Sequence, residues 1–181
     1  MPQFVALLRG VNVGKSNRVP MAAFRELLEA QGFSEVQTLL NSGNAVFRST
    51  ARSAASHATA IGAGLRESLG VSVLVVVKSS SEFLTVVAQN PIVFPESLHS
   101  RFLVAFAQGL AATQRLSILL PMLQPPEQFH IGSTAAYLHC AGGILESKAG
   151  SALLGKLGCE VTTRNWATVL KLRALLGNGV A

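Results

Sequence analysis

The 181-residue chain lacks several features that would assign it to a specialised class of protein. Its two cysteines, Cys140 and Cys159, are too few for a disulfide framework. It has no run of about 18 strongly apolar residues; the longest stretch without a charge, residues 128–145, contains histidines, glycines, a serine and a threonine. Charged residues make up 13% and hydrophobic residues 49% of the chain, a balance that argues against a disordered protein.

The N-terminal residues "MPQFVALLRG" lack the basic segment, the long apolar core and the cleavage site of a secretory signal. Together with the low cysteine content, this predicts a protein of the reducing cytoplasm with no membrane partner.

Acidic residues are scarce: nine, against fifteen lysines and arginines, which gives a net charge of +6 and a pI near 10. A balance of this sign suits nucleic acid, phosphorylated ligands or an acidic protein surface as partners. Composition alone does not choose among the three.

The first half of the chain alternates strand-like and helix-like patterns, punctuated by glycine and proline. The predicted elements are a strand at 3–10, a helix at 20–32, a hairpin at 35–47, a helix at 51–70 and a strand at 71–78. This β-α-β-β-α-β order is that of a ferredoxin-like fold.

A similar order returns after a short helix at 80–89 and a proline-containing linker. The predicted elements are a strand at 101–108, a helix at 112–123, a hairpin at 127–140, a helix at 147–158, a strand at 159–164 and a helix at 165–176. The sequence therefore predicts an α+β fold built as a tandem repeat of two ferredoxin-like (βαββαβ) halves, 1–96 and 97–181. The final helix is an addition to the second half.

The loop after the first strand concentrates positive charge, with no acid between residues 1 and 24. Its glycines let backbone N–H groups approach a ligand, and its asparagines can donate hydrogen bonds. Its candidate ligand-binding residues are Arg9, Asn12, Lys15, Asn17 and Arg18. Three residues separate the two glycines before the lysine, whereas a P-loop has four residues between its glycines, so we reject that motif. A solvated basic loop that caps a sheet is the alternative.

A second candidate region surrounds the start of the final helix. Lys148, Thr163, Arg164 and Asn165 could form an anion site with the N–H groups of the first helical turn, because a helix N-terminus carries partial positive charge. Thr163 or Asn165 could also simply cap the helix. In that alternative, Arg164 pairs with a nearby glutamate, either Glu146 or Glu160.

Other chemistries find no support in the sequence. The four histidines are scattered, and no cysteine–histidine spacing fits zinc, so we expect neither a metal nor a cofactor. There is no nucleophile elbow and no dinucleotide fingerprint. Base stacking on the sheet, as in RNA-recognition domains, is not expected, because the hairpin strand at 44–49 offers only Phe47.

Motifs spread along the chain resemble a bacterial family of domains of unknown function, DUF1697. They are "ALLRGVNVG" (6–14), "VPMAAFRELLEAQGF" (19–33), "SGNAVF" (42–47), "SK" (147–148) and "LGCEVTTRNWATVLKL" (157–172). The resemblance implies two ferredoxin-like halves in tandem and implies no activity. The loop reads Gly14-Lys15-Ser16-Asn17 here, where the family typically has Gly-Gly-Lys-Asn.

Three functions follow as hypotheses. In the first, the basic loop and residues 162–165 meet between the halves and hold a phosphorylated or carboxylated ligand or a nucleic-acid backbone. In the second, the protein is an enzyme acting on an anionic substrate through Arg164, Lys148 or Lys15, with Glu146, Glu160 or His139 as the general base. In the third, it is an interaction module or homodimer built from open sheet edges.

Overall fold

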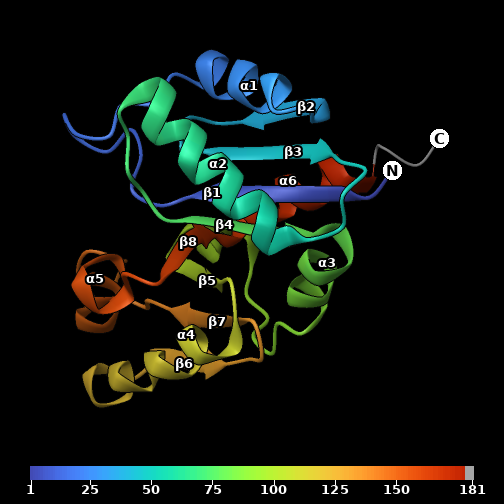
Figure 1. Cartoon of the computed structure of the whole chain (residues 1–181). Helices are drawn as coiled ribbons and strands as arrows, with labels where there is room; N and C mark the ends of the chain where they lie inside the picture. Colours follow the sequence, from blue (N-terminus) through green and yellow to red (C-terminus); the bar gives the residue numbers. More distant parts are fainter. Residues whose placement is uncertain (178–181) are drawn as a thin grey trace. The chain divides into compact units, whose positions relative to one another are not determined.

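The computed structural model describes residues 1–177 and divides the chain into two compact units, each with its own sheet (Figure 1). Among the described residues, unit 1 comprises Met1–Leu84 together with residues 174–177, and unit 2 comprises Thr85–Arg173. The fold is mixed α/β, with two four-stranded antiparallel sheets.

Unit 1 contains a sheet with the strand order β2-β3-β1-β4, in which every neighbouring pair is antiparallel. Its elements are β1 (Gln3–Leu8), α1 (Met21–Ala30), β2 (Ser34–Leu39), β3 (Asn44–Arg48), α2 (Ala54–Leu69) and β4 (Val75–Ser79). Figure 1 shows α1 and α2 on the same side of this sheet, and their apolar residues join alternate strand residues in one buried cluster.

The helices of unit 1 form where the sequence predicts them. On α1, the buried residues Phe24, Leu27 and Leu28 recur at helical spacing and face the sheet. The hydroxyl of Ser53 caps α2 by accepting a hydrogen bond from the Ser56 N–H, and Gly70 ends the helix in a left-handed conformation, with φ of 65°.

Unit 2 repeats the pattern, with the strand order β6-β7-β5-β8 and antiparallel pairing throughout. Its elements are η1 (Glu96–Arg101), β5 (Phe102–Ala107), α4 (Leu110–Arg115), η2 (Leu116–Met122), β6 (Gln128–Ile131), β7 (Ala135–His139), α5 (Lys148–Leu154), η3 (Lys156–Gly158) and β8 (Val161–Asn165), where η marks a 3-10 helix. A second buried cluster joins β5, β7 and β8 to η2 and α5.

One further helix follows the last strand of each sheet. These helices are α3 (Ser80–Ala88), after β4, and α6 (Trp166–Gly177), after β8. In unit 2, the Tyr137 hydroxyl donates to the Val86 carbonyl oxygen at 2.6 Å and so ties the end of α3 to the sheet. Burial raises the pKa of Tyr137 to about 12, so this hydroxyl keeps its proton over the whole physiological range.

Element boundaries differ from the predictions where proline or register intervenes. The helix predicted at 112–123 is a short α-helix continued by a 3-10 segment that contains Pro121, because proline offers no N–H for an α-helical bond. The strand predicted from residue 71 starts only at Val75, where pairing with β1 begins at Leu8.

Within residues 1–177, no helix combines the length and apolarity needed to cross a membrane.

Candidate functional site

The basic loop between β1 and α1 turns back on itself through residues with unusual backbone geometry. Asn12 and Asn17 have φ values of 58° and 51°, in the left-handed region that asparagine tolerates better than most residues. The Asn12 N–H donates to the Asn17 carbonyl oxygen at 3.1 Å, which closes the loop. The loop is therefore a defined turn that ends at Val19, which is fully buried.

The Asn12 side chain holds this turn in place through three hydrogen bonds to backbone groups. Its Nδ2 donates to the carbonyl oxygens of Val19, at 2.8 Å, and Asn41, at 2.7 Å. Its Oδ1 accepts from the Val19 N–H at 2.9 Å. Because both amide protons are used, Asn12 positions the loop against the β2–β3 hairpin and has no N–H left for a ligand.

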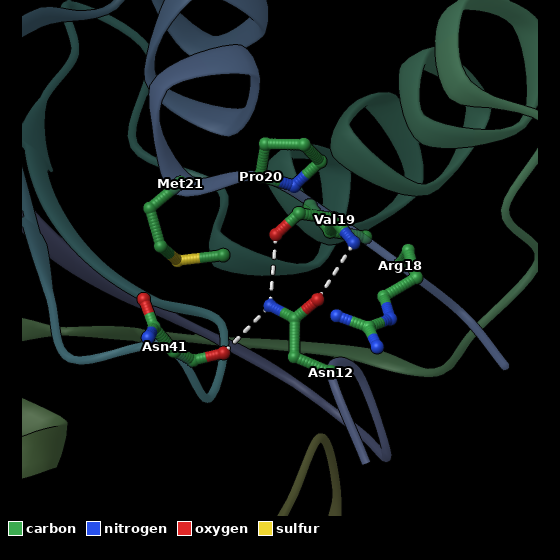
Figure 2. Close-up of a pocket in the computed structure, with 6 residues that line it drawn as sticks. All are labelled: Asn12, Arg18, Val19, Pro20, Met21 and Asn41. Carbon is green, nitrogen blue, oxygen red and sulfur yellow. Dashed lines mark hydrogen bonds between the residues drawn. The ribbon is translucent and has the colours of Figure 1, made fainter. Parts of the chain in front are cut away.

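A pocket of about 360 Å³ lies beside this amide. The residues that line it are Asn12, Arg18, Val19, Pro20, Met21 and Asn41. Figure 2 shows the Asn12 amide between Arg18 on one side and Met21 with Asn41 on the other. Arg18 is the only charged residue in this set, and its side chain is exposed.

The pocket also lies at the N-terminus of α1. Pro20 occupies the N-cap position and provides no side-chain hydrogen bond, and the first turn of the helix contains no acid. The first N–H groups of a helix have no partner within it and carry about half a positive charge. Arg18 and this helix end thus contribute positive potential to the same pocket.

The other candidate residues of the loop lie outside this lining set. Lys15 and Asn17 are exposed, and the Asn17 side chain makes only a long 3.5 Å contact with the Gly10 carbonyl oxygen. Arg9 is half-buried, and its backbone N–H donates to the Leu74 carbonyl oxygen. The structure therefore brings two of the five predicted residues, Asn12 and Arg18, to one pocket.

In unit 2, Arg164 lies within β8, consistent with the strand predicted at 159–164, but it is only 7% exposed, whereas the predicted anion site needs an accessible guanidinium. Its guanidinium donates to the Thr162 hydroxyl at 2.9 Å and to the Thr163 carbonyl oxygen at 2.7 Å. Burial lowers the pKa of Arg164 to about 10, so the group stays charged at neutral pH. The hydrogen bonds to Thr162 and Thr163 are those of a residue built into the sheet.

The remaining residues of the second region have separate positions. Asn165 caps α6, since its Oδ1 accepts from the Thr168 N–H at 2.9 Å. Lys148 is exposed at the start of α5, which is capped by the preceding Ser147. The basic loop belongs to unit 1 and residues 162–165 to unit 2, so their meeting remains a prediction.

The acids and the histidine considered as general bases are also in unit 2. Glu160 accepts two hydrogen bonds from Arg115, at 2.5 and 2.6 Å. His139 is buried, and neither ring nitrogen has a hydrogen-bond partner. Burial lowers its pKa, with Glu127 and Arg101 acting in opposite directions. Among residues 1–177, no three His, Cys, Asp or Glu side chains gather as a metal site.

Sequence reasoning did not assign four of the six lining residues to a site: Val19, Pro20, Met21 and Asn41. Pro20 and Met21 were predicted only as the start of the helix at 20–32. Asn41 was predicted only as part of the hairpin at 35–47, in the polar turn before Gly43. The only available signal was the polar "NSGN" turn, and nothing in its spacing links residue 41 to residue 12.

The comparisons with known proteins agree with the sequence resemblance. The family described as "Protein of unknown function (DUF1697)" matches residues 1–137. The solved structure of the conserved bacterial protein SP0830 from Streptococcus pneumoniae is similar, with a TM-score of 0.81 and 23% identity over 97% of this chain and 98% of that chain. At this identity the likeness shows the fold alone. No curated protein matches the chain.

Proposed function

The chain belongs to the DUF1697 family of proteins of unknown function, and we propose from its site that it binds a small ligand through a phosphate or carboxylate group. The site is the pocket of unit 1. The observation that carries the proposal is the meeting, in one cavity, of Arg18 and an α1 N-terminus that has neither a side-chain cap nor an acid in its first turn.

The expected affinity follows from the two positive elements. A helix N-terminus stabilises an anion by about 0.3–2 kcal/mol, and a hydrogen bond to a charged group contributes about 1.5–3 kcal/mol. Their sum, roughly 2–5 kcal/mol, corresponds to a Kd of about 0.2 mM at best for a bare anion. Tighter binding requires the ligand to add an apolar portion that contacts Val19, Pro20 and Met21, the apolar lining residues.

A single arginine beside one helix end suits one anionic group better than a run of phosphates. Nucleic-acid binding draws on many cationic contacts along a backbone, each of which steepens the dependence on salt. We therefore favour a small ligand, and a nucleic-acid backbone stays an alternative. The predicted homodimer and the predicted enzyme have no observation in their favour among the contacts described above.

Two further proposals concern the fold and the location of the protein, and they are independent of the ligand. We propose that each unit is a ferredoxin-like half, because the strand orders β2-β3-β1-β4 and β6-β7-β5-β8 are the same and are what β-α-β-β-α-β connectivity produces. We also propose a cytoplasmic location, on the grounds that Cys140 and Cys159 are both free thiols.

The test is a thermal-shift and calorimetric titration of the full chain with inorganic phosphate, nucleoside monophosphates and aromatic carboxylates. Substituting Arg18→Ala removes the charged lining residue and should weaken binding by about tenfold, the equivalent of about 1.4 kcal/mol. The matched control is Arg66→Ala, which removes the same charge from the exposed surface of α2.

Ligand-induced stabilisation of the wild type and of Arg66→Ala, but not of Arg18→Ala, would support the proposal. Equal stabilisation of all three proteins would show that anions respond to the net charge of the chain and not to the pocket. Failure of every anion tested at 10 mM to stabilise the wild type would refute the proposal. Retention of a DNA oligonucleotide only below about 50 mM salt would identify non-specific attraction.

A further inference from the structure

A second, smaller pocket lies in unit 2, at the end of the hairpin formed by β6 and β7. Its volume is about 220 Å³. Its lining residues come from the turn before β6 and the loop after β7, namely Gln124, Pro125, Pro126, Glu127, Ala141, Gly142, Glu146 and Ser147. A space of this size suits the end group of a small molecule or of a side chain.

The charge of this pocket is opposite to that of the chain. The protein carries +6, yet both charged lining residues, Glu127 and Glu146, are acids. Three glutamates elsewhere pair with arginines, whereas within residues 1–177 neither of these two forms an ion pair. At physiological salt the screening length is about 8 Å, so these carboxylates outweigh the distant net charge for a group inside the pocket.

One of the two carboxylates is held in a fixed position. The Glu127 N–H donates to the Gln124 carbonyl oxygen at 2.8 Å, and the Gln124 N–H donates to Glu127 Oε2 at 3.0 Å. This reciprocal turn uses one carboxylate oxygen and leaves Oε1 free to accept from a ligand. An acceptor held in this way loses little conformational entropy when it binds a donor.

We propose that this pocket binds a cationic nitrogen group, an alkylguanidinium or alkylammonium, between Glu127 and Glu146. Proline rings and the small residues of the opposite loop line the rest of the cavity and would contact the alkyl portion. A guanidinium can donate to two carboxylates at once through its planar set of N–H groups, so it should bind more tightly than an ammonium. The group can belong to a free amine or to an arginine side chain of a peptide.

A positively charged residue close to the pocket allows a substitution that should strengthen cation binding, the opposite of the effect expected at the glutamates. The Arg101 guanidinium donates to the carbonyl oxygen of Ala141, a lining residue, at 3.0 Å. Because Arg101 repels a bound cation, Arg101→Gln should tighten binding by about two- to fivefold. Substitutions at the glutamates should weaken it, and a merely structural disturbance would not produce changes of both signs.

The experiment is an isothermal titration of the full chain with agmatine, with n-butylamine and with the capped peptide acetyl-Gly-Arg-Gly-amide, at 20 and 150 mM salt. The variants are Glu127→Gln and Glu146→Gln, since glutamine keeps an oxygen that can accept the Gln124 N–H. The control is Glu67→Gln, which removes an exposed acid from α2 in unit 1. Circular dichroism of each variant verifies that it is folded.

We expect agmatine to bind the wild type and Glu67→Gln alike, each pocket variant to weaken binding about tenfold, and the double variant to abolish it. Tighter binding of the peptide than of agmatine would identify an arginine side chain as the occupant, and the reverse order a free amine. No heat of binding at 10 mM agmatine, or equal affinity in the double variant, would overturn the proposal. Neither result bears on the anion pocket of unit 1, which the Arg18 titration tests separately.

Discussion

The Asn12 side chain is the part of the proposed anion site whose energetic contribution can be worked out most directly. Substituting Asn12→Ala removes hydrogen bonds of 2.7, 2.8 and 2.9 Å to the backbone of Val19 and Asn41. At about 1 kcal/mol net for each bond, reduced because the site is partly exposed, the loss is about 2–3 kcal/mol. Alanine at φ of 58° adds about 1 kcal/mol of backbone strain.

A matched substitution in the same loop separates these two contributions. Asn17 also has a left-handed backbone, with φ of 51°, but its side chain makes only the 3.5 Å contact with Gly10. Asn17→Ala should therefore cost only the strain, about 1 kcal/mol. The difference between the two variants, about 2–3 kcal/mol, measures the hydrogen bonds of the Asn12 amide.

The assay is urea unfolding followed by far-ultraviolet circular dichroism, with hydrogen exchange of β1 and β3 amides reporting on unit 1. Unit 1 requires its own probe because the only tryptophan, Trp166, belongs to unit 2. A difference below about 0.5 kcal/mol between the two alanine variants would refute the view that Asn12 holds the loop. In that event the pocket would not be preformed, and the anion proposal would lose its structural basis.

The remaining predictions concern unit 2. His139→Phe should stabilise the protein by about 1 kcal/mol at pH 7, because it keeps the ring stacked 4.0 Å from Phe94 and removes two unpartnered buried nitrogens. The folded-state pKa of His139 lies below its ordinary value of 6.5, so below that pH the unfolded chain binds more protons and the stability of the fold falls as the pH drops. Urea titrations between pH 5 and 8 should show a smaller loss of stability in His139→Phe than in the wild type. An identical pH profile of the two proteins would contradict this account of His139. Gly158→Ala should destabilise the protein by about 3 kcal/mol or more, because the added Cβ would overlap the Leu153 carbonyl group; an unchanged melting temperature would show that η3 can move to admit it.

Hydrophobic periodicity was sufficient to predict most of the elements. The stripe on α1 and the serine cap and glycine stop of α2 are local signals that depend on neighbouring residues alone. The same holds for the β6–β7 hairpin, which lies within the predicted range 127–140 and turns between Ile131 and Ala135 at a glycine, a serine and a threonine. Errors occurred at boundaries, such as the start of β4, where cross-strand pairing decides how far a strand extends.

The pocket of unit 1 could be predicted only in part, because it depends on contacts distant in sequence. The concentration of positive charge identified the loop and included Arg18, which lines the pocket. The approach of Asn41 to Asn12 spans 29 residues and arises from the packing of one turn against another. The spacing of residues in the sequence does not predict this contact, so Asn41 could be identified as a lining residue only from the structure.

The contrast between Arg18 and Arg164 decides which of the two basic motifs is better suited to bind an anion. Both arginines lie a few residues before a helix, and the sequence alone made them equally good candidates for binding an anion. Strand pairing places Arg164 opposite Val104 within the sheet, where it is buried and its guanidinium already donates to Thr162 and Thr163. A ligand that recruited it would have to compete with these bonds inside the fold. Arg18 is exposed at a pocket beside an uncapped helix end, so an anion there would replace water rather than protein.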